Sequence, residues 1–234
     1  MLPPSDDGPP IREHQIRVER TARYHVLGSP GPDVRACWFV LHGYGQLAES
    51  LLRRCSSLAA PDALVVAPEA LSRFYLNLNL DSPAGHANAR VGASWMTHEA
   101  REAEIADYIG YLERLRAELG RECGGGRLET RILGFSQGVA TAVRWAVLGA
   151  GDPPRTLVLW AGSLPTETWT DAARTRLAGT ELVLAAGDAD PFLSPDDLTR
   201  TADRLETAGY RVRPFGFPGG HTITPELVSR ALVI

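Results

Sequence analysis

The sequence is poor in cysteine, with three in 234 residues. Cys37, Cys55 and Cys123 are odd in number and show no C-x-x-C spacing. This pattern argues against a disulfide framework and against a structural zinc site. We therefore expect all three thiols to be reduced.

Long apolar runs and a strong charge bias are also absent. No stretch approaches about 18 consecutive apolar residues, the length of a membrane-spanning helix. The net charge is −4 and the 24 Lys+Arg positions are scattered, so we expect neither nucleic acid nor an anionic membrane as a partner. Residues 1–10 are proline-rich and lack the charged start and apolar stretch of a signal peptide. A disordered lead-in and a cytoplasmic location are the expectation.

What the chain does contain is an alternation of short apolar runs with helical patterns. Loose alternation over 15–27 predicts one or two antiparallel edge strands. Apolar runs typical of strands buried on both faces occur at 36–41 and 63–67 and are repeated at 156–160 and 182–186, and further strands are predicted at 128–133 and 210–217. Helices are expected at 48–59, over a long segment ending near Gly120, at 137–148, at 195–208 and from 225 onward. The pattern predicts one α/β domain over 11–234, with a mostly parallel sheet and helices on both faces.

The segment 68–97 shows no clear periodicity, and a loop this long in a compact domain is usually functional. It contains the aromatic residues Phe74, Tyr75 and Trp95, which are candidates for substrate contact. These aromatic side chains are equally suited to packing in the hydrophobic core. The sequence leaves open whether this loop is a mobile lid or a fixed wall.

Gly134-Phe135-Ser136-Gln137-Gly138 lies between a predicted strand and a predicted helix. A sharp strand-to-helix turn exposes the serine hydroxyl, and its flanking glycines let the two backbones pass. By composition alone the motif has roughly a one-in-ten chance of arising by accident. Its position after a buried strand makes Ser136 a candidate nucleophile.

A serine nucleophile needs a base, and the base needs a group that orients it. His221 follows Gly219-Gly220 at the end of the last predicted strand. Asp188 and Asp190 both follow the preceding strand, and either can act as the acid. The order Ser, Asp, His along the chain is the order of the α/β-hydrolases.

The remaining histidines are weaker candidates for the base. His14 and His25 lie in the expected edge-strand region, while His86 and His98 flank the long loop, where either can touch substrate. His42 is expected mainly to brace its own loop by a hydrogen bond.

The oxyanion of an acyl-transfer intermediate needs preorganised N–H donors. Gln137 follows the nucleophile at a helix start, where its amide is free. Tyr44 lies on the glycine-rich loop after the first buried strand, the other donor position of this fold. Only the main chains of these two residues are required.

These segments together resemble the phospholipase/carboxylesterase family of small α/β-hydrolases, relatives of the acyl-protein thioesterases. The matching stretches are 41–45, the Trp95 region, 134–138, 188–191 and 219–221. The resemblance implies an α/β-hydrolase fold, serine esterase activity, Asp190 as the triad acid, and no cofactor or metal. The sequence departs from the family pattern at two places, and both bear on substrate preference. Tyr44-Gly45-Gln46-Leu47 stands where the thioesterases have a Leu-Gly-Asp stretch, and Phe192-Leu193 replaces the usual small aliphatic residues after Asp-Pro.

The leading hypothesis is hydrolysis of small or medium carboxylic esters, or thioesters, through an acyl-enzyme on Ser136. In this hypothesis His221 is general base and acid, Asp190 orients it, and Phe192 joins the substrate-contact candidates. Two alternatives stay open: a serine peptidase acting on short peptides, and an inactive binding protein on the same fold. The sequence does not indicate the length of the acyl chain or the preference between esters and thioesters. It also does not distinguish a monomer from a homodimer.

Overall fold

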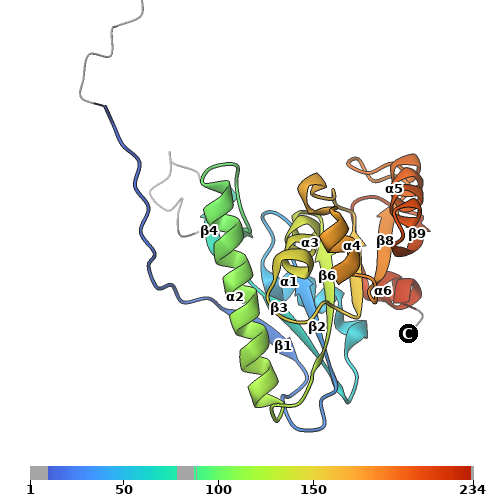
Figure 1. Ribbon diagram of the computed structural model, residues 1–234, viewed down its shortest axis with the longest axis horizontal. Coiled ribbons are helices and arrows are strands. Elements are labelled where there is room, and N and C mark those ends of the chain that lie inside the picture. Colours follow the sequence, from blue (N-terminus) through green and yellow to red (C-terminus); the bar gives the residue numbers. More distant parts are fainter. Residues whose placement is uncertain (1–9, 78–86, 88, 233–234) are drawn as a thin grey trace, which may run out of the picture.

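A seven-stranded sheet forms the centre of the molecule (Figure 1). The computed structural model describes residues 10–77, 87 and 89–232. The strand order is β1-β3-β2-β6-β7-β8-β9, and every neighbouring pair is parallel except β1 with β3. The strands are β1 (Tyr24–Leu27), β2 (Ala36–Leu41), β3 (Ala63–Pro68), β6 (Glu129–Phe135), β7 (Thr156–Trp160), β8 (Glu181–Gly187) and β9 (Arg211–Phe217).

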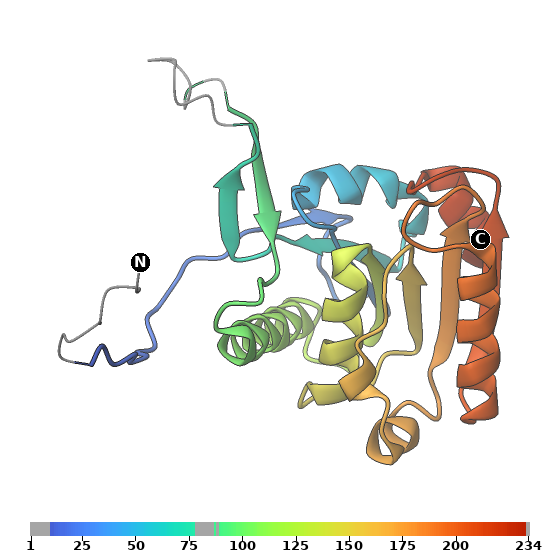
Figure 2. The same cartoon turned by 90° about the horizontal axis from the view of Figure 1, so that it is seen from above.

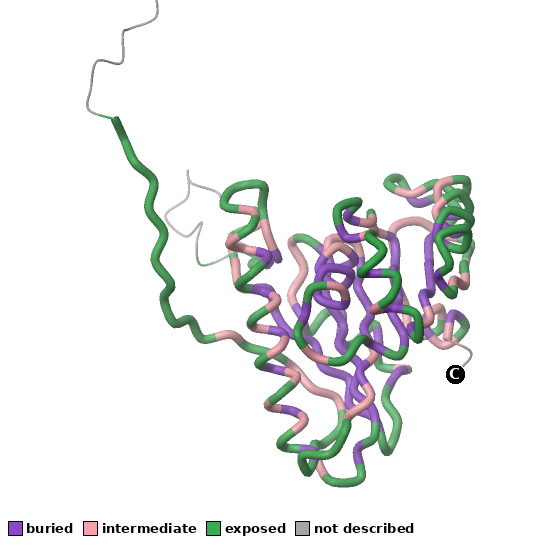
Figure 3. Tube along the Cα trace, in the orientation of Figure 1, coloured by how far each residue is buried: buried purple, intermediate pink, exposed green. Residues whose placement is uncertain are grey.

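Helices cover both faces of this sheet (Figure 2). One face carries α1 (Ala48–Arg54) and α6 (Pro225–Leu232), whose apolar residues join one core cluster. The other carries α2 (Arg101–Glu122), α3 (Gln137–Leu148) and α5 (Pro195–Thr207), whose apolar residues join a second cluster, and the short α4 (Asp171–Arg176), which Leu177 anchors in the same cluster. Short 3-10 turns occur at Ser56–Leu58 and Thr166–Thr168. Because both faces are covered, the central strands are continuous apolar runs, buried in Figure 3.

The expected α/β class, with a mostly parallel sheet, is confirmed. The edge strand is shorter than expected because Tyr24 already pairs with Pro68, the last residue of β3. Residues before it run past the sheet, so Ile16 and Val18 are exposed. The first helix also ends early, at Arg54, and α4 was not predicted from the sequence.

The expectation of an irregular loop over 68–97 is partly wrong. Strands β4 (Ser72–Tyr75) and β5 (Val91–Ser94) form a separate antiparallel sheet. This hairpin docks on the loop after β2: Gly45 N donates to Ala93 O (2.9 Å), and Ala93 N donates to Gln46 O (3.1 Å). Most of the segment between the two strands, including His86, lies outside the described residues, and so does the expected lead-in up to residue 9. The choice between lid and wall is therefore not addressed.

The chain reverses direction across the sheet between β2 and β6. From β2 it moves outward to β3, whereas from β6 it moves the other way to β7 and β8. In open α/β sheets, ligands bind outside the carboxyl ends of strands at such a switch point. The His42–Gln46 loop and Ser136 both follow strands at this position.

Candidate active site

Ser136 occupies a strained turn between β6 and α3. Its φ is 54° and its ψ is −118°, a conformation that an L-residue adopts only when the surroundings enforce it. A Cβ on Gly134 would lie 2.3 Å from Gly138 O, and one on Gly138 would lie 2.0 Å from Leu41 O. The glycines on both sides are therefore required by close backbone approach, as expected from the motif.

His221 is hydrogen-bonded to Asp190 across two loops. Its Nδ1 lies 2.8 Å from Asp190 Oδ2, and the other carboxylate oxygen accepts the N–H of Phe192 at 2.8 Å. The Asp190 side chain is fully buried, while the His221 side chain is 21% exposed. Asp188, the alternative acid, instead accepts the N–H of Gly219 at 2.9 Å and braces the loop that carries His221.

Trp160 links the serine turn to the histidine loop. Its carbonyl accepts the N–H of Ser136 (2.9 Å), and its indole N–H donates to Thr222 O (2.8 Å). The ring of His221 packs on Phe135, with 5.0 Å between ring centroids. No hydrogen bond joins the Ser136 hydroxyl to the His221 ring within the described chain, and in substrate-free sites such bonds are often long.

The Tyr44 loop has one main-chain N–H left without an acceptor among the described residues. Gly43 N donates to the Gln46 side chain (3.0 Å), Gly45 N to Ala93 O and Gln46 N to Gly43 O (3.2 Å). The N–H of Tyr44 is the one that remains. At the other side of the serine turn, the N–H of Gln137 is likewise unused in the part of the chain that the structure describes.

The side chain of Gln137 has a separate task. Its Oε1 accepts the N–H of Trp95 (3.1 Å), and its Nε2 donates to Met96 O (2.9 Å) and to Ser94 Oγ (3.1 Å). These bonds tie the end of β5 to the start of α3. The segment after β5 is thereby held beside the serine turn.

His42 is fully buried and braces the loop. Its Nε2 accepts the N–H of Ala70 (3.0 Å), so its Nδ1 carries the proton and donates to Gly43 O (2.8 Å). Burial lowers the pKa of His42, which keeps the ring neutral. Both ring nitrogens are therefore engaged in holding the backbone.

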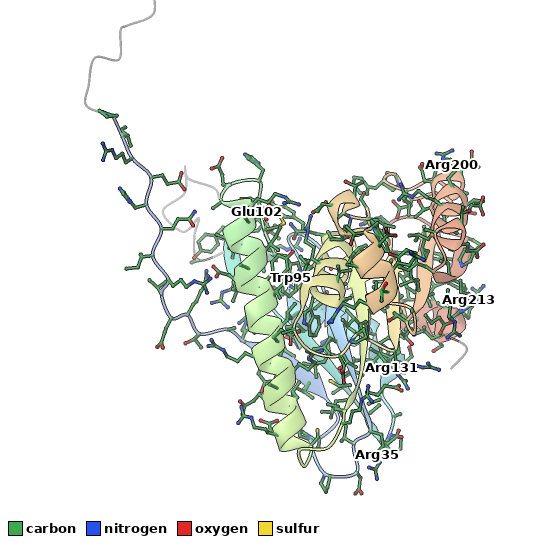
Figure 4. The ribbon with its side chains drawn as sticks, viewed as in Figure 1. Arg35, Trp95, Glu102, Arg131, Arg200 and Arg213 are labelled. Carbon is green, nitrogen blue, oxygen red and sulfur yellow. The ribbon has the colours of Figure 1, made fainter. Side chains whose placement is uncertain are left out.

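The four substrate-contact candidates lie in different environments. Phe192 is 74% exposed, and its ring packs edge-on against His221 with centroids 4.9 Å apart. Phe74 packs against the exposed ring of Tyr44, and Tyr75 is exposed on the same strand. Trp95 lies beside α2 (Figure 4), is 3% exposed and donates to His42 O, which agrees with the alternative of a core-packing aromatic. It is a core residue that supports the loop.

Of the other candidate histidines, the three in the described part of the chain, His14, His25 and His98, are not brought to the serine. His25 pairs with Ala67 in the edge strand β1. His98 is almost fully exposed beside Glu99, and His14 is exposed in the segment before β1. Within the described residues, no group of three or more His, Cys, Asp or Glu side chains is arranged to hold a metal ion. No described helix is long and apolar enough to cross a membrane.

Two residues that help to shape the site, Trp160 and Gln46, were not identified as such from the sequence. One bond of Trp160 joins β7 to the turn after β6 and the other joins it to the loop after β9, segments far apart in the sequence, so no local pattern points to them. Gln46 appeared only as a departure from the thioesterase pattern. Its side-chain bond to Gly43 N closes the turn that leaves Tyr44 N free.

No protein-family model matches this chain, and no curated protein sequence matches it either. Solved structures do match. A carboxylesterase from Mesorhizobium loti aligns with a TM-score of 0.64 at 22% identity, over 89% of this chain and 91% of that one. Zea mays acyl-protein thioesterase 2 aligns at 0.62 and 20% identity, over 90% and 96%. A phospholipase/carboxylesterase from Dyadobacter fermentans aligns at 0.61 and 16% identity, over 92% and 96%. The chain thus shares the α/β-hydrolase fold of carboxylesterases and acyl-protein thioesterases.

Proposed function

We propose that this protein is a serine hydrolase that cleaves carboxylic esters through an acyl-enzyme on Ser136. The observation that carries the proposal is the buried Asp190 carboxylate hydrogen-bonded to His221, on a loop that Trp160 ties to the strained turn of Ser136. The fold shared with carboxylesterases and a thioesterase supports the same reaction class.

The chemistry follows from the roles of these groups. His221 takes the hydroxyl proton of Ser136 as the serine oxygen attacks the ester carbonyl carbon. The main-chain N–H groups of Tyr44 and Gln137 stabilise the oxyanion that forms. The carbon–oxygen bond to the alcohol then breaks as His221 returns its proton to the leaving oxygen. Water repeats the sequence on the acyl-enzyme, which releases the acid and restores Ser136.

Asp190 keeps the imidazole in the tautomer with a proton on Nδ1, so that Nε2 is free to accept. A protonated imidazole cannot accept the serine proton, so His221 acts as the base in its neutral form.

Labelling with a fluorophosphonate probe tests the nucleophile. The native protein is expected to be modified, and Ser136→Ala is expected to lose all modification. Ser163→Ala is the matched control, since Ser163 follows the neighbouring strand β7 and is exposed. Labelling that persists in Ser136→Ala, or none in the native chain, overturns the proposal.

A substrate panel tests the reaction class. We expect p-nitrophenyl esters to be cleaved faster than aminoacyl anilides of similar size. The reverse order would assign the same residues to a peptidase. Thioesters in the same panel measure the preference between the two ester types.

A further inference from the structure

A cavity of about 390 Å³ opens between α3 and the segment that leads into α2. Its walls are residues 96–98, Arg101 and one face of α3, which carries Gln137, Thr141 and Arg144 at helical spacing. Gln137 follows the candidate nucleophile directly. The cavity therefore begins at the serine turn and continues along the helix.

Two polar groups in its walls, Arg144 Nη1 and the Thr141 hydroxyl, lack a strong acceptor. The Arg144 side chain is 9% exposed; its Nε and Nη2 donate to Glu167 Oε1 (3.1 and 2.8 Å), its Nη1 reaches the weakly accepting Met96 sulfur at 3.3 Å, and the guanidinium lies near the Tyr108 hydroxyl. Thr141 is 1% exposed, and its hydroxyl has no hydrogen-bond partner in the described part of the chain. Occupied acceptors include Gln137 Oε1, which accepts from Trp95 N, and Met96 O, which accepts from Gln137 Nε2.

The charge in this region favours an anionic ligand. The guanidiniums of Arg101 and Arg144 share a single carboxylate, Glu167. The hydrogen bond from Arg144, with a further one from Arg101, lowers the pKa of Glu167 to about 2, so Glu167 is ionised at neutral pH. Arg101 also pairs with Glu102, whose side chain is 83% exposed and therefore well solvated. Glu104 and Glu99 also lie beside the wall residues Thr97 and His98, so the charge that favours an anionic ligand is that of the nearly buried Arg144 guanidinium.

The location also indicates which part of a substrate would enter the cavity. His221 packs on Phe135, whose side chain belongs to the core cluster of the α1 and α6 face. The cavity is lined by residues of α3 and of the segment that leads into α2, and both helices pack into the core cluster of the opposite face. The leaving alcohol must lie next to His221 to receive its proton. The acyl part is then the part that extends towards the cavity.

We propose that this cavity is an acyl subsite for a carboxylate, so that the preferred substrates are half-esters of dicarboxylic acids. The inference rests on the proposed esterase function and deepens it. Arg144 Nη1 and the Thr141 hydroxyl donate to the distal carboxylate of the acyl chain, which supplies the acceptor oxygens that the walls lack.

The p-nitrophenyl half-ester of adipic acid and its neutral methyl diester are matched probes. The native enzyme is expected to show a kcat/KM about 10- to 100-fold higher for the half-ester, the usual range for a charge-assisted hydrogen bond in a partly buried site. Arg144→Met is expected to bring this ratio near one, and Thr141→Val to lower it several-fold. Arg213→Met is the matched control: Arg213 of β9 forms a half-exposed pair with Glu181 of β8, far from Glu102 at the start of α2 (Figure 4).

Each outcome decides a different point. Equal rates for the two esters, or a ratio that persists in Arg144→Met, overturns the subsite and leaves the esterase proposal standing. If Arg144→Met does not fold, the ratio in Thr141→Val decides. If neither ester is hydrolysed, the esterase proposal fails, and calorimetric titration of Ser136→Ala with the half-ester decides the subsite. Tighter binding than the diester, lost on adding Thr141→Val, supports it; equal binding contradicts it.

Discussion

On one side of the candidate site, Asp190 and His221 present the side chains that we propose as acid and base; on the other, Tyr44 and Gln137 present the main-chain N–H groups that we propose as oxyanion donors. The first side, which we call the acid–base side, is connected by bonds between the loops after β8 and β9. The second, the donor side, is held by pairing of the Tyr44 loop with β5 and by the Gln46 side chain.

This difference changes what each side requires of the sequence. The acid–base side depends on the chemistry of its own residues, so that replacing one removes a function directly. The donor side tolerates changes of its own side chains, and Tyr44 stands where the thioesterases have leucine. It is sensitive instead to neighbours that set the direction of two N–H bonds. Substitutions should therefore have effects of different size and kind on the two sides.

The largest expected effect is on the acid–base side, from Asp190→Asn. An amide at this position stabilises the wrong imidazole tautomer, and we expect kcat to fall by about 10³- to 10⁴-fold. Asp188→Asn is the matched control two residues away. It weakens one bond to Gly219 N and should cost less than about tenfold. Steady-state kinetics with a p-nitrophenyl ester measures both, and similar losses would remove the distinction between the two aspartates.

A smaller effect is expected on the donor side from Gly92→Ala. A Cβ at this position would lie 2.5 Å from Gly45 O, so the hairpin must move away from the Tyr44 loop. We expect kcat to fall by about 10- to 100-fold through the misdirected N–H of Tyr44. Fluorophosphonate labelling should slow in parallel, because it uses the same oxyanion donors.

Gly110→Ala provides the control for glycine replacement. Gly110 is exposed within α2, and nothing lies within 4 Å of the added Cβ. There the change should raise the unfolding free energy by about 0.5–1 kcal/mol and leave the rate unchanged. Native activity in Gly92→Ala would show that the hairpin does not control the donor.

The contrast between the two sides also separates what the sequence predicts from what it does not. Strands such as β2 and β8 were predictable, because strands covered on both faces are continuous apolar runs. The hairpin was missed because its strands are four residues each and pair with the rest of the described chain through a single isolated bridge, between Ala93 and Gln46. On the acid–base side, residue types identified Ser136 and His221 as candidates but could not choose between Asp188 and Asp190. Only the loop path brings Asp190 to His221.

On the donor side, a milder effect is expected from Gln46→Leu. Leucine leaves the N–H of Gly43 without its acceptor and loosens the turn that aims Tyr44 N. We expect kcat to fall by about 3- to 10-fold with little change in KM, since the oxyanion donor acts in the transition state. Gln46→Glu keeps an acceptor oxygen and should stay closer to the native rate. An equal loss in both variants would mean that the amide group itself, and not its oxygen, is required.

The smallest effect concerns the ion pairs beside the donor side, where Glu167 joins Arg144 of α3 to Arg101 of α2. The folded pKa of Glu167, about 2, lies below its ordinary value of 4.5. Its charge therefore stabilises the fold above pH 4.5, and this contribution is lost as the pH falls towards 2. Because the side chain is 46% exposed, solvent screening keeps the contribution small. The melting temperature of Glu167→Gln should lie slightly below that of the native protein at neutral pH and converge with it in acid. A difference that widens towards pH 2 would show that the charge of Glu167 does not stabilise this side of the site.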